Sequence, residues 1–473
     1  MVVMSIQLFI VGLYIALLFG ISFYAKRRAA TGQGFLFAGR ELNTTLVAVN
    51  VTGLAIGAAS TIGVAENAFT VGVAAGWYNA AWAAGAAVMG LVAAAKYREM
   101  DCTTIPELFE RYYDKKGRII SVFGLITIQL VITSMQYLAG GAILSSLLPE
   151  VFTLRSGMIT SAIVFIGITL IGGLWSSGLS NLLSVALIYG GIILSTLLIV
   201  TNQGGLGSIA AALPMETAWF SPVGSLGLAT IIGWFVVMIT QTITAQGPVQ
   251  IACGAKSGRV ARNGYLLGAV LIFPIGFLCA VMGLAAKAAY PDISATLALP
   301  KIIMSLDPVV AGVTLAALWA ADVSTACTLL LGAGTLFTQD IYKRFINPTV
   351  DDTKYLHVSR LTILVLGLVT LWLAFNAVGI LRTLLIGLSL TTAFTVVFLF
   401  TIFAPAWCRR NSAFYTTLAG MVTLLAWQLF PTVRVFAHPI YLEWLVCLGT
   451  FLAVAVLDGE RISVPAPGKT ALV

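Results

Sequence analysis

Long apolar segments recur along the whole chain, and they limit its fold more than any other feature. An α-helix needs about 20 apolar residues to cross a bilayer, and thirteen segments approach or exceed that length. They lie at residues 5–26, 46–72, 73–98, 119–149, 157–177, 180–202, 224–250, 263–289, 307–340, 358–377, 380–404, 413–431 and 440–458. Charged residues make up only 9% of the chain, against about 25% in soluble domains. The sequence therefore predicts an all-α polytopic membrane protein with thirteen transmembrane helices.

Basic residues fall in alternate loops between these segments. If the N-terminus lies outside, 21 of the 26 lysines and arginines lie on the inner side. The outer loops keep Arg155, Lys287, Lys301, Arg382 and Arg434. Inner loops of membrane proteins are enriched in these residues, so we expect an outside N-terminus and a cytoplasmic C-terminus in the plasma (inner) membrane. The net charge of +8 then follows from topology and indicates no nucleic-acid partner.

Two of the segments contain many residues that interrupt a helix. Segment 46–72 holds Gly53 and Gly57 among polar side chains, and segment 224–250 ends in Gly247 and Pro248. A helix broken at membrane depth frees carbonyl groups and half-helix ends, which bind ions and substrate where they line a cavity. A kink that serves packing alone is the alternative for each.

The two interrupted segments are the second and the seventh, and this spacing predicts a domain organisation. Two inverted repeats of five helices would begin with them, at residues 46–202 and 224–404. The chain would then comprise a first helix and inner loop (1–45), a ten-helix transport core (46–404), two C-terminal helices (405–460) and a cytoplasmic tail (461–473).

The ninth segment carries an acid, Asp322, in the middle of an apolar run, close to Ser324, Thr325 and Thr328. A charge near the bilayer centre costs about 2.5 kcal/mol or more, so it persists where a cavity, an ion or a partner compensates it. Alternatively, a neutral Asp322 hydrogen-bonds a neighbouring helix and serves packing.

The residue types do not form a catalytic constellation. The two histidines, His357 and His438, lie far apart in sequence, and no phosphate-binding loop of the form GxxxxGK[ST] occurs. We expect no enzyme activity and no ATP-driven transport, so any driven transport must use a gradient.

Three groups of residues resemble motifs of one transporter family. Residues 168–176 read ITLIGGLWS, residues 320–344 read AADVSTACTLLLGAGTLFTQDIYKR, and FLFAGRELN and TIPELFERYYD begin at Phe35 and Thr104. In this order and at these separations they resemble the sodium/solute symporter family, which includes proline, pantothenate, sialic acid and glucose transporters. The resemblance implies the leucine-transporter-type fold, a ten-helix inverted repeat with one helix before it and two after it.

The resemblance also implies a sodium site. By position, the ion would take backbone carbonyls of Gly53 and Ile56, the carbonyl of Ala321 and the hydroxyls of Ser324 and Thr325. The chemistry agrees, because residues at i, i+3 and i+4 share one helix face.

Some members of the family bind a second sodium, and here the match is incomplete. The matching positions are Cys327, Thr328 and Asn181, where an amide stands in place of an acid and a thiol in place of a hydroxyl. Asp322 is a departure from the family. It would face a neighbouring helix, tune the ion site, or bind a proton.

Candidate solute-binding residues are polar side chains on four of the segments: Ser60, Thr61, Gln129, Gln136, Thr240, Gln241, Thr244 and Ser389. They suit a small neutral or zwitterionic solute that forms hydrogen bonds. Glu66 and Asp322 leave a cationic solute open. For each polar residue, a hydrogen bond between helices is the alternative.

The sequence thus predicts a secondary active transporter that moves a small polar organic solute into the cell with Na⁺ by alternating access. The alternatives are a proton-coupled symporter or an uncoupled facilitator that uses Asp322, and a transporter-like sensor of solute. We expect a lipid bilayer around a monomeric transport unit.

Overall fold

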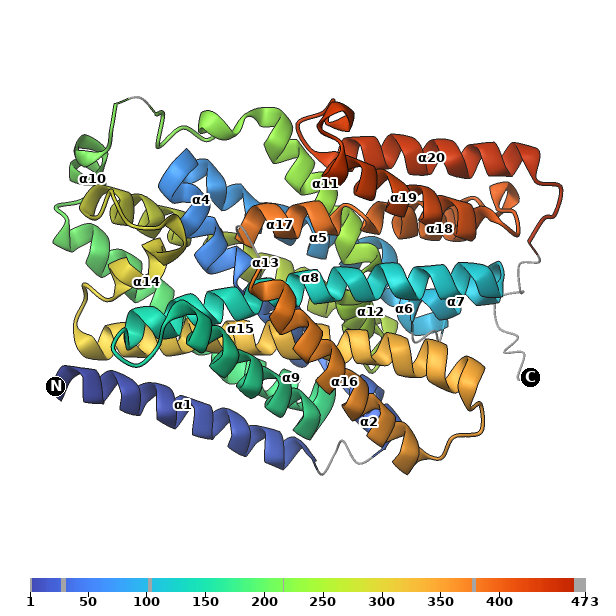
Figure 1. The fold of residues 1–473 in the computed structure, drawn as a ribbon, viewed down its shortest axis with the longest axis horizontal. Coiled ribbons are helices and arrows are strands. Elements are labelled where there is room, and N and C mark those ends of the chain that lie inside the picture. The colour runs from blue at the N-terminus through green and yellow to red at the C-terminus, as the bar shows by residue number, and fades with distance from the viewer. Residues whose placement is uncertain (1, 27–30, 101–103, 216, 377–379, 463–473) are drawn as a thin grey trace.

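The computed structural model describes the chain except residues 1, 27–30, 101–103, 216, 377–379 and 463–473. The described residues form a bundle of helices, many of which run along the long axis of Figure 1. They contain no strand, only isolated bridges between Leu42 and Ala255 and between Arg409 and Arg461. The predicted all-α class is confirmed. Most of the predicted tail, residues 461–473, lies outside the described residues.

Helices fill all thirteen predicted segments. In chain order they are α1 (Val2–Lys26), α3, η2 and α4 (Thr44–Ala55, Ala59–Gly63, Val64–Val71), η3, α5, η4 and α6 (Val73–Gly76, Trp77–Val88, Met89–Ala93, Ala94–Met100), α8 (Lys115–Leu147), α9 (Leu154–Asn202, two segments), α11 and α12 (Leu228–Thr244, Gln246–Cys253), α13 (Gly258–Ala289), α15 and η7 (Pro308–Phe337, Thr338–Ile346), α16 (Asp352–Ala374), α17 and α18 (Ile380–Leu388, Thr391–Phe403), α19 (Ser412–Leu429) and α20 (Pro439–Leu457). Shorter helices connect them, among them α2 (Gly32–Phe37), α7 (Ile105–Tyr112), η6 (Ala295–Leu297) and α14 (Ala298–Ile303).

The number of membrane spans is counted from length and composition. Nine of the described helices are long and apolar enough to cross a membrane, or up to eleven spans when each of two bent pairs is counted as one. Gly12–Lys26, within α1, is a shorter apolar helix. The count of thirteen stays a prediction.

The second predicted span is broken, as its glycines indicate. After α3 the backbone leaves the helical region at Ile56 (φ −90°, ψ 71°), and the two halves of the span meet at 56°. Gly57 follows at the break, where a Cβ atom would lie 2.5 Å from the hydroxyl oxygen of Thr325 and 2.7 Å from the amide oxygen of Gln136. A residue with a side chain would therefore push this break away from α8 and α15.

The seventh predicted span is broken between α11 and α12, which meet at 47°. Ala245 has an extended backbone (φ −69°, ψ 142°) between the two helices. Pro248 lies in the first turn of α12, where its missing N–H removes the bond that a continuous helix would form to the carbonyl of Thr244. Both breaks thus coincide with the glycines and the proline that predicted them.

The glycine pair of the ITLIGGLWS motif turns the chain back on itself within α9. Gly173 has φ 55° inside α9 and packs against the backbone of Phe35 in α2. Before the turn, Ser161 accepts a hydrogen bond from Trp319 of α15. After it, Asn181 lies against Gly53 and Ser195 bonds to Thr314 at the start of α15. The two halves of α9 therefore run along α15 in opposite directions.

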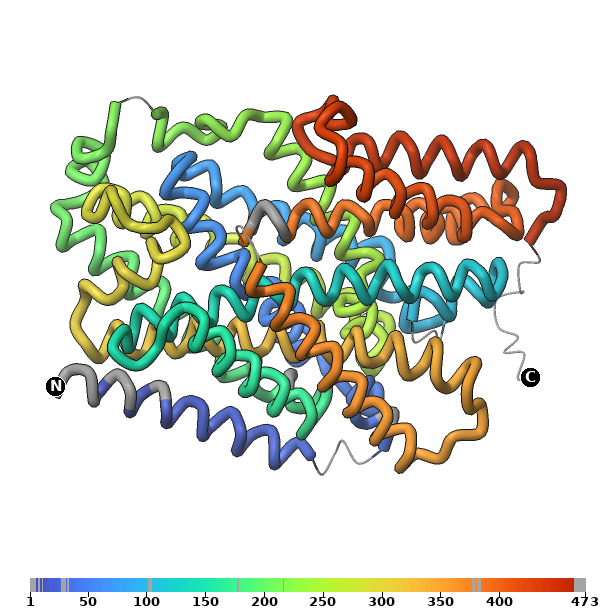
Figure 2. The backbone as a smooth tube through the Cα atoms, viewed as in Figure 1, coloured from blue at the N-terminus to red at the C-terminus, as the bar shows by residue number. Residues whose placement is uncertain are grey.

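Helix α15 is the most enclosed long helix of the bundle. Nearly every residue from Ala311 to Leu336 is buried, and α8 and α9 pack along it. The two C-terminal helices, α19 and α20, lie together at one edge of the bundle (red in Figure 2). This arrangement places the polar residues of α15 in the interior, next to the break after α3.

Candidate functional site

The break after α3 meets the middle of α15 through one shared carbonyl. The hydroxyl of Ser324 donates to the carbonyl oxygen of Gly53 at 3.1 Å and to that of Ala321 at 3.0 Å. The hydroxyl of Thr325 donates to the same Gly53 oxygen at 2.8 Å. Four of the five residues predicted to bind sodium therefore lie in one hydrogen-bonded cluster, which we call the α3–α15 cluster.

Ile56, the fifth predicted residue, lies beside the α3–α15 cluster. Its N–H still bonds to the carbonyl of Thr52 at 2.8 Å, so it is the last residue tied to α3. The next residue, Gly57, is the one that packs against the hydroxyl of Thr325. The carbonyl of Ile56 thus belongs to the non-helical backbone next to the cluster.

The electrostatics of the cluster favour a cation. The last carbonyls of a helix lack helical partners and carry the negative end of its dipole. Here the end of α3 supplies such carbonyls, and α15 adds two hydroxyl oxygens that can turn their protons away. All of these groups offer uncharged oxygen atoms as ligands, the type that hard cations prefer.

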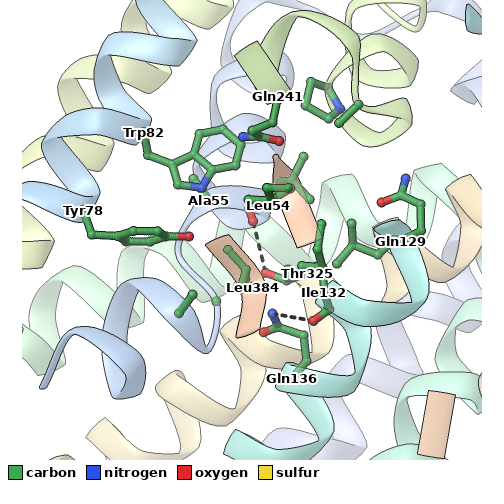
Figure 3. Close-up of a pocket in the computed structure, with 16 residues that line it drawn as sticks. Leu54, Ala55, Tyr78, Trp82, Gln129, Ile132, Gln136, Gln241, Thr325 and Leu384 are labelled. Atoms are coloured by element: carbon green, nitrogen blue, oxygen red, sulfur yellow. Dashed lines mark hydrogen bonds between the residues drawn. The ribbon is translucent and has the colours of Figure 1, made fainter. Parts of the chain in front are cut away.

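A small cavity adjoins the cluster, and Thr325 belongs to both. Its volume is about 30 Å³, and its walls include Gln129 and Gln136 from α8, Gln241 from α11, and Tyr78 and Trp82 from α5. Figure 3 shows these side chains around the end of α3. A buried water needs about 10–15 Å³ of such space. The cavity can therefore hold about two waters, and a solute needs it to widen.

Residues 35–420 match the family described as "SSF: Sodium:solute symporter family". That range covers well over half of the chain. The chain belongs to the sodium:solute symporter family.

This symporter is similar to characterised relatives along most of its length. The "Sodium/glucose cotransporter" of Vibrio parahaemolyticus is 26% identical, over 75% of this chain and 72% of that protein. The "Sodium/proline symporter" of Escherichia coli strain K12 is 22% identical, over 87% of this chain and 85% of that protein. The family and these relatives make the chain a sodium-coupled transporter of a small solute, with Na⁺ as its coupling ion. They do not favour the proton-coupled, uncoupled or sensor alternatives.

Solved structures agree on the fold. A Na⁺-coupled sialic acid symporter in a substrate-bound outward-open state matches with a TM-score of 0.81 and 18% identity, over 96% of this chain and 98% of that chain. A nucleobase-cation-symport-1 family transporter in a closed conformation matches with a TM-score of 0.63 and 14% identity, over 90% and 95% of the two chains. The leucine-transporter-type fold predicted from the sequence is confirmed.

Three of the eight predicted solute-binding residues of the symporter, Gln129, Gln136 and Gln241, line the cavity, and the other five do not. The solute-binding role of all eight stays a prediction. Ser60, Thr61 and Ser389 donate to backbone carbonyls four or five residues earlier in the chain, those of Ala55, Gly57 and Leu385. Thr244 bonds to Thr395 at 2.8 Å, and Thr240 accepts a bond from Trp444 at 3.3 Å, both away from the cavity. Short hydroxyl side chains bond to nearby backbone more readily than they reach into a cavity.

The sequence reasoning missed the aromatic part of the cavity wall. Tyr78 and Trp82 lie four residues apart in the alanine-rich helix α5, so they share one face. In the sequence, two large aromatic residues four positions apart in an alanine-rich segment could have indicated this wall of the cavity. Glu66, considered for a cationic solute, lies outside the cavity. It accepts bonds from the hydroxyl of Thr296 at 2.9 Å and the N–H of Ile380 at 3.4 Å.

Asp322 is fully buried, and neither of its carboxyl oxygens has a hydrogen-bond partner in the described part of the chain. One turn to either side on α15 lie Trp319 and Thr325, both of which face α8 near Gly140 and Gln136. Among the described residues, Arg118 is the only fully buried arginine or lysine. Arg118 lies 18 residues before Gln136 on α8, about 27 Å along the helix axis. Among the described residues, no lysine or arginine therefore forms an ion pair with Asp322.

The residues predicted for a second ion do not converge. The amide of Asn181 donates to Asn50 at 3.2 Å and lies against Gly53. The hydroxyl of Thr328 donates to the carbonyl of Ser324 at 3.0 Å. The thiol of Cys327 is directed to the carbonyl of Phe165 at 3.4 Å. These three residues thus bond to different partners, and a second ion site stays a prediction.

An ion-pair network joins α7, the start of α8 and η7, on the side predicted to be cytoplasmic. Arg118 contacts Glu110 and Asp340, each at 2.5 Å, and Arg344 contacts Glu110 at 2.7 Å. Thr104, which caps α7, donates to Asp340 at 2.9 Å. Partial burial raises the pKa of Glu110, but hydrogen bonds from the two guanidinium groups outweigh it and hold the pKa below its usual value.

Proposed function

We propose that this symporter carries a small polar organic solute into the cell together with Na⁺ bound at the α3–α15 cluster. Gly53, Ile56 and Ala321 would contribute carbonyl oxygens, and Ser324 and Thr325 would contribute hydroxyl oxygens. The observation that carries the proposal is that both hydroxyls of α15 bond to the carbonyl of Gly53, at the point where α3 breaks.

The ligand count supports sodium. The five residues offer five oxygens, and carbonyls, hydroxyls and water are the ligands that hard cations take. The hydroxyl protons of Ser324 and Thr325, which now bond to carbonyls, would turn aside when the ion enters. With the bound ion as its compensating charge, Asp322 would then be ionised and would supply a negative charge in the same turn of α15, which would deepen the site without contacting the ion.

The solute would bind in the cavity beside the cluster. Of the described residues that line it, none is an aspartate, glutamate, lysine, arginine or histidine. A charge buried there without a partner would cost several kcal/mol, so a solute with no net charge fits best. Gln129, Gln136 and Gln241 offer donors and acceptors, and Tyr78 and Trp82 offer apolar faces with polar edges.

Thr325 would couple the two binding events. It belongs to the cluster through Gly53 and to the cavity wall through its place beside Gln136. An ion that fixes the break after α3 would therefore also fix one wall of the solute site. Binding of either partner would favour the other, because coupling free energies between sites are reciprocal.

Alternating access would require the two ends of the pathway to open in turn. The bonds from Thr296 and Ile380 to Glu66 tie α4 to the outer segments, and the Arg118 network ties α7 and α8 to η7 at the inner end. We place these ends by the predicted topology, with the N-terminus outside, the C-terminus in the cytoplasm and a monomer in the plasma membrane. The bent spans would begin repeats 46–202 and 224–404.

Uptake into proteoliposomes tests the function. L-proline and D-glucose, the solutes named for the relatives, are presented first, with an inward Na⁺ gradient, an inward H⁺ gradient or neither. We expect uptake of a solute only with the Na⁺ gradient, and its loss in Gln241→Ala. Uptake that is driven by H⁺ alone, or that ignores both gradients, would contradict sodium coupling.

A further inference from the structure

A second acid, Glu443, lies buried in the interface formed by the C-terminal helices, outside the α3–α15 cluster. Its side chain is 0% exposed, although it belongs to the apolar helix α20. A Cβ atom on Gly420 of α19 would lie 3.2 Å from the Oε2 atom of Glu443 and 3.0 Å from the Cβ atom of Ala393 in α18. The carboxyl group therefore occupies the space that the missing side chain of Gly420 leaves between α18, α19 and α20.

The helices that pack against Glu443 provide no cation. Helix α20 packs mainly against α19, α18 and α11. The sequences of these four helices contain no lysine or arginine. Their other titratable side chains are Tyr415, Tyr441 and Cys447, and His438 caps α20 with its Nδ1 accepting from the N–H of Ile440. An ionised Glu443 would thus have no counter-ion.

Several polar atoms around Glu443 lack partners. The thiol of Cys447 donates to Oε2 of Glu443 at 3.5 Å, but Oε1 has no partner among the described residues. One turn before Gly420 on α19, the buried hydroxyls of Thr416 and Thr417 also have none. The carbonyl of Thr416 lies 3.9 Å from the Cys447 thiol, which places this turn of α19 beside the carboxyl group.

We propose that Glu443 is a proton-binding site within the membrane, separate from the sodium site. An isolated carboxylate in such surroundings would cost so much free energy that the group takes up a proton instead. A proton needs no added space, whereas a metal ion would have to fit where Gly420 already lies in close contact. The neutral carboxyl group keeps α18, α19 and α20 packed, and loss of the proton loosens them.

The site is connected to the transport core. Trp444, the next residue, donates from its indole to the hydroxyl of Thr240 on α11 at 3.3 Å. The hydroxyl of Thr395 on α18 donates to the carbonyl of Thr240 at 2.9 Å. The next residue of α11, Gln241, lines the cavity. When the packing of α20 and α18 loosens, the position of Gln241 in the wall of the solute site therefore changes as well. Transport of the solute then falls when Glu443 loses its proton.

Infrared spectroscopy of the purified protein tests the proposal without reference to sodium or solute. Glu443 is the only fully buried glutamate among the described residues. We expect the folded protein labelled with ¹³C-glutamate to show a carboxylic-acid band at neutral pH that the labelling shifts. The band is absent from Glu443→Gln and present in Glu460→Gln, whose side chain is 64% exposed.

The labelled wild-type protein gives this result even if Glu443→Gln does not fold. Absence of a protonated glutamate band from folded wild type would overturn the proposal. So would a band that Glu443→Gln retains, or one that added Na⁺ or K⁺ abolishes, since the last result would make the site a metal site. Because the band requires neither ion nor solute, its failure would leave the proposed sodium coupling untouched.

Discussion

The hydroxyl of Thr325 donates a hydrogen bond of 2.8 Å to the carbonyl oxygen of Gly53, from the middle of one helix to the broken end of another. Ser324 donates to the same oxygen at 3.1 Å. Two donors on one carbonyl keep the break next to α15 and orient the oxygens that an ion would use. The residues of the cluster therefore already lie together in this structure. When an ion enters, its bonds to their oxygen atoms would replace the hydrogen bonds between them.

The two hydroxyl positions of α15 differ in what they contact, and this predicts different effects of removing them. Ser324→Ala removes a hydroxyl that meets Gly53, whereas the hydroxyl of Thr328 donates to the carbonyl of Ser324 in its own helix. We expect Ser324→Ala to raise the Na⁺ concentration for half-maximal uptake several-fold more than Thr328→Ala. Equal shifts in the two variants would count against our placement of the ion.

Gly53 is a position where a side chain does not fit. A Cβ atom there would lie 2.5 Å from the side-chain amide of Asn181. We expect Gly53→Ala to displace the break and to weaken sodium-dependent uptake by tenfold or more. Asn181→Ala in the same chain should restore part of it, because it clears the space.

Gly449→Ala is the matched control for Gly53→Ala, since a Cβ atom on Gly449 has no neighbour within 4 Å. It should leave uptake unchanged. If Asn181→Ala gave Gly53→Ala no recovery at all, the close contact between these two residues would not be the cause of the defect.

We predict that the charge of Asp322 contributes to the free energy of ion binding. A carboxylate with no protein partner stabilises a cation bound nearby, and removal of one charge weakens such an interaction by about 1–2 kcal/mol at an effective dielectric constant of ~20. We expect Asp322→Asn to raise the dissociation constant for Na⁺ about tenfold and to leave solute affinity at saturating Na⁺ nearly unchanged. Isothermal titration with NaCl measures both. An unchanged sodium affinity would mean that Asp322 serves packing.

The ion pairs at the inner end predict unequal losses of stability. Arg118→Ala leaves Asp340 buried without its cation, and breaking a buried pair in this way costs about 3–5 kcal/mol. Arg344→Ala removes a partly exposed partner of Glu110 and should cost about 1 kcal/mol or less. Thermal unfolding in detergent compares the two. A larger loss in Arg344→Ala would contradict the burial that we assign to Arg118.

The same network gives a pH dependence with a definite sign. The pKa of Glu110 is lowered in the folded protein by Arg344 and Arg118, so its contribution is present above the ordinary carboxyl pKa. That contribution is lost as the pH falls through the lowered value. Glu110→Gln should therefore reduce the acid-induced loss of stability and have no such effect on the alkaline side.

Much of this fold could be predicted from the sequence, because a helix that crosses a membrane must be both long and apolar. The all-α class and the breaks at Gly57 and Pro248 followed from residue type, whereas the turn at Gly173 lies in a motif that was identified only by resemblance. The residues of the ion cluster were implied by the resemblance to the family, and the spacing of three α15 residues on one helix face agreed with it. What periodicity could not supply was the register between helices, which decides whether Thr328 or Ser324 meets Gly53.

Which polar residues line the cavity was predicted less well, and for a physical reason. Gln129, Gln136 and Gln241 have side chains long enough to leave their own helices, and these three line the cavity. Ser60, Thr61 and Ser389 bond to nearby backbone, and Thr240 and Thr244 bond to side chains of other helices, neither of which a sequence distinguishes from bonding to solute. The charge on Asp322 was visible, but its lack of a partner required the structure.

The most direct measurement of the central claim is Na⁺ binding to the purified protein by equilibrium binding of ²²Na⁺, with K⁺ or choline as competitor. Wild type should bind one Na⁺ that choline does not displace, and the double variant Ser324→Ala with Thr325→Ala should lose it while Gly449→Ala keeps it. If the double variant, still folded, bound Na⁺ with wild-type affinity and stoichiometry, the ion would lie elsewhere and the account of the α3–α15 cluster would be wrong.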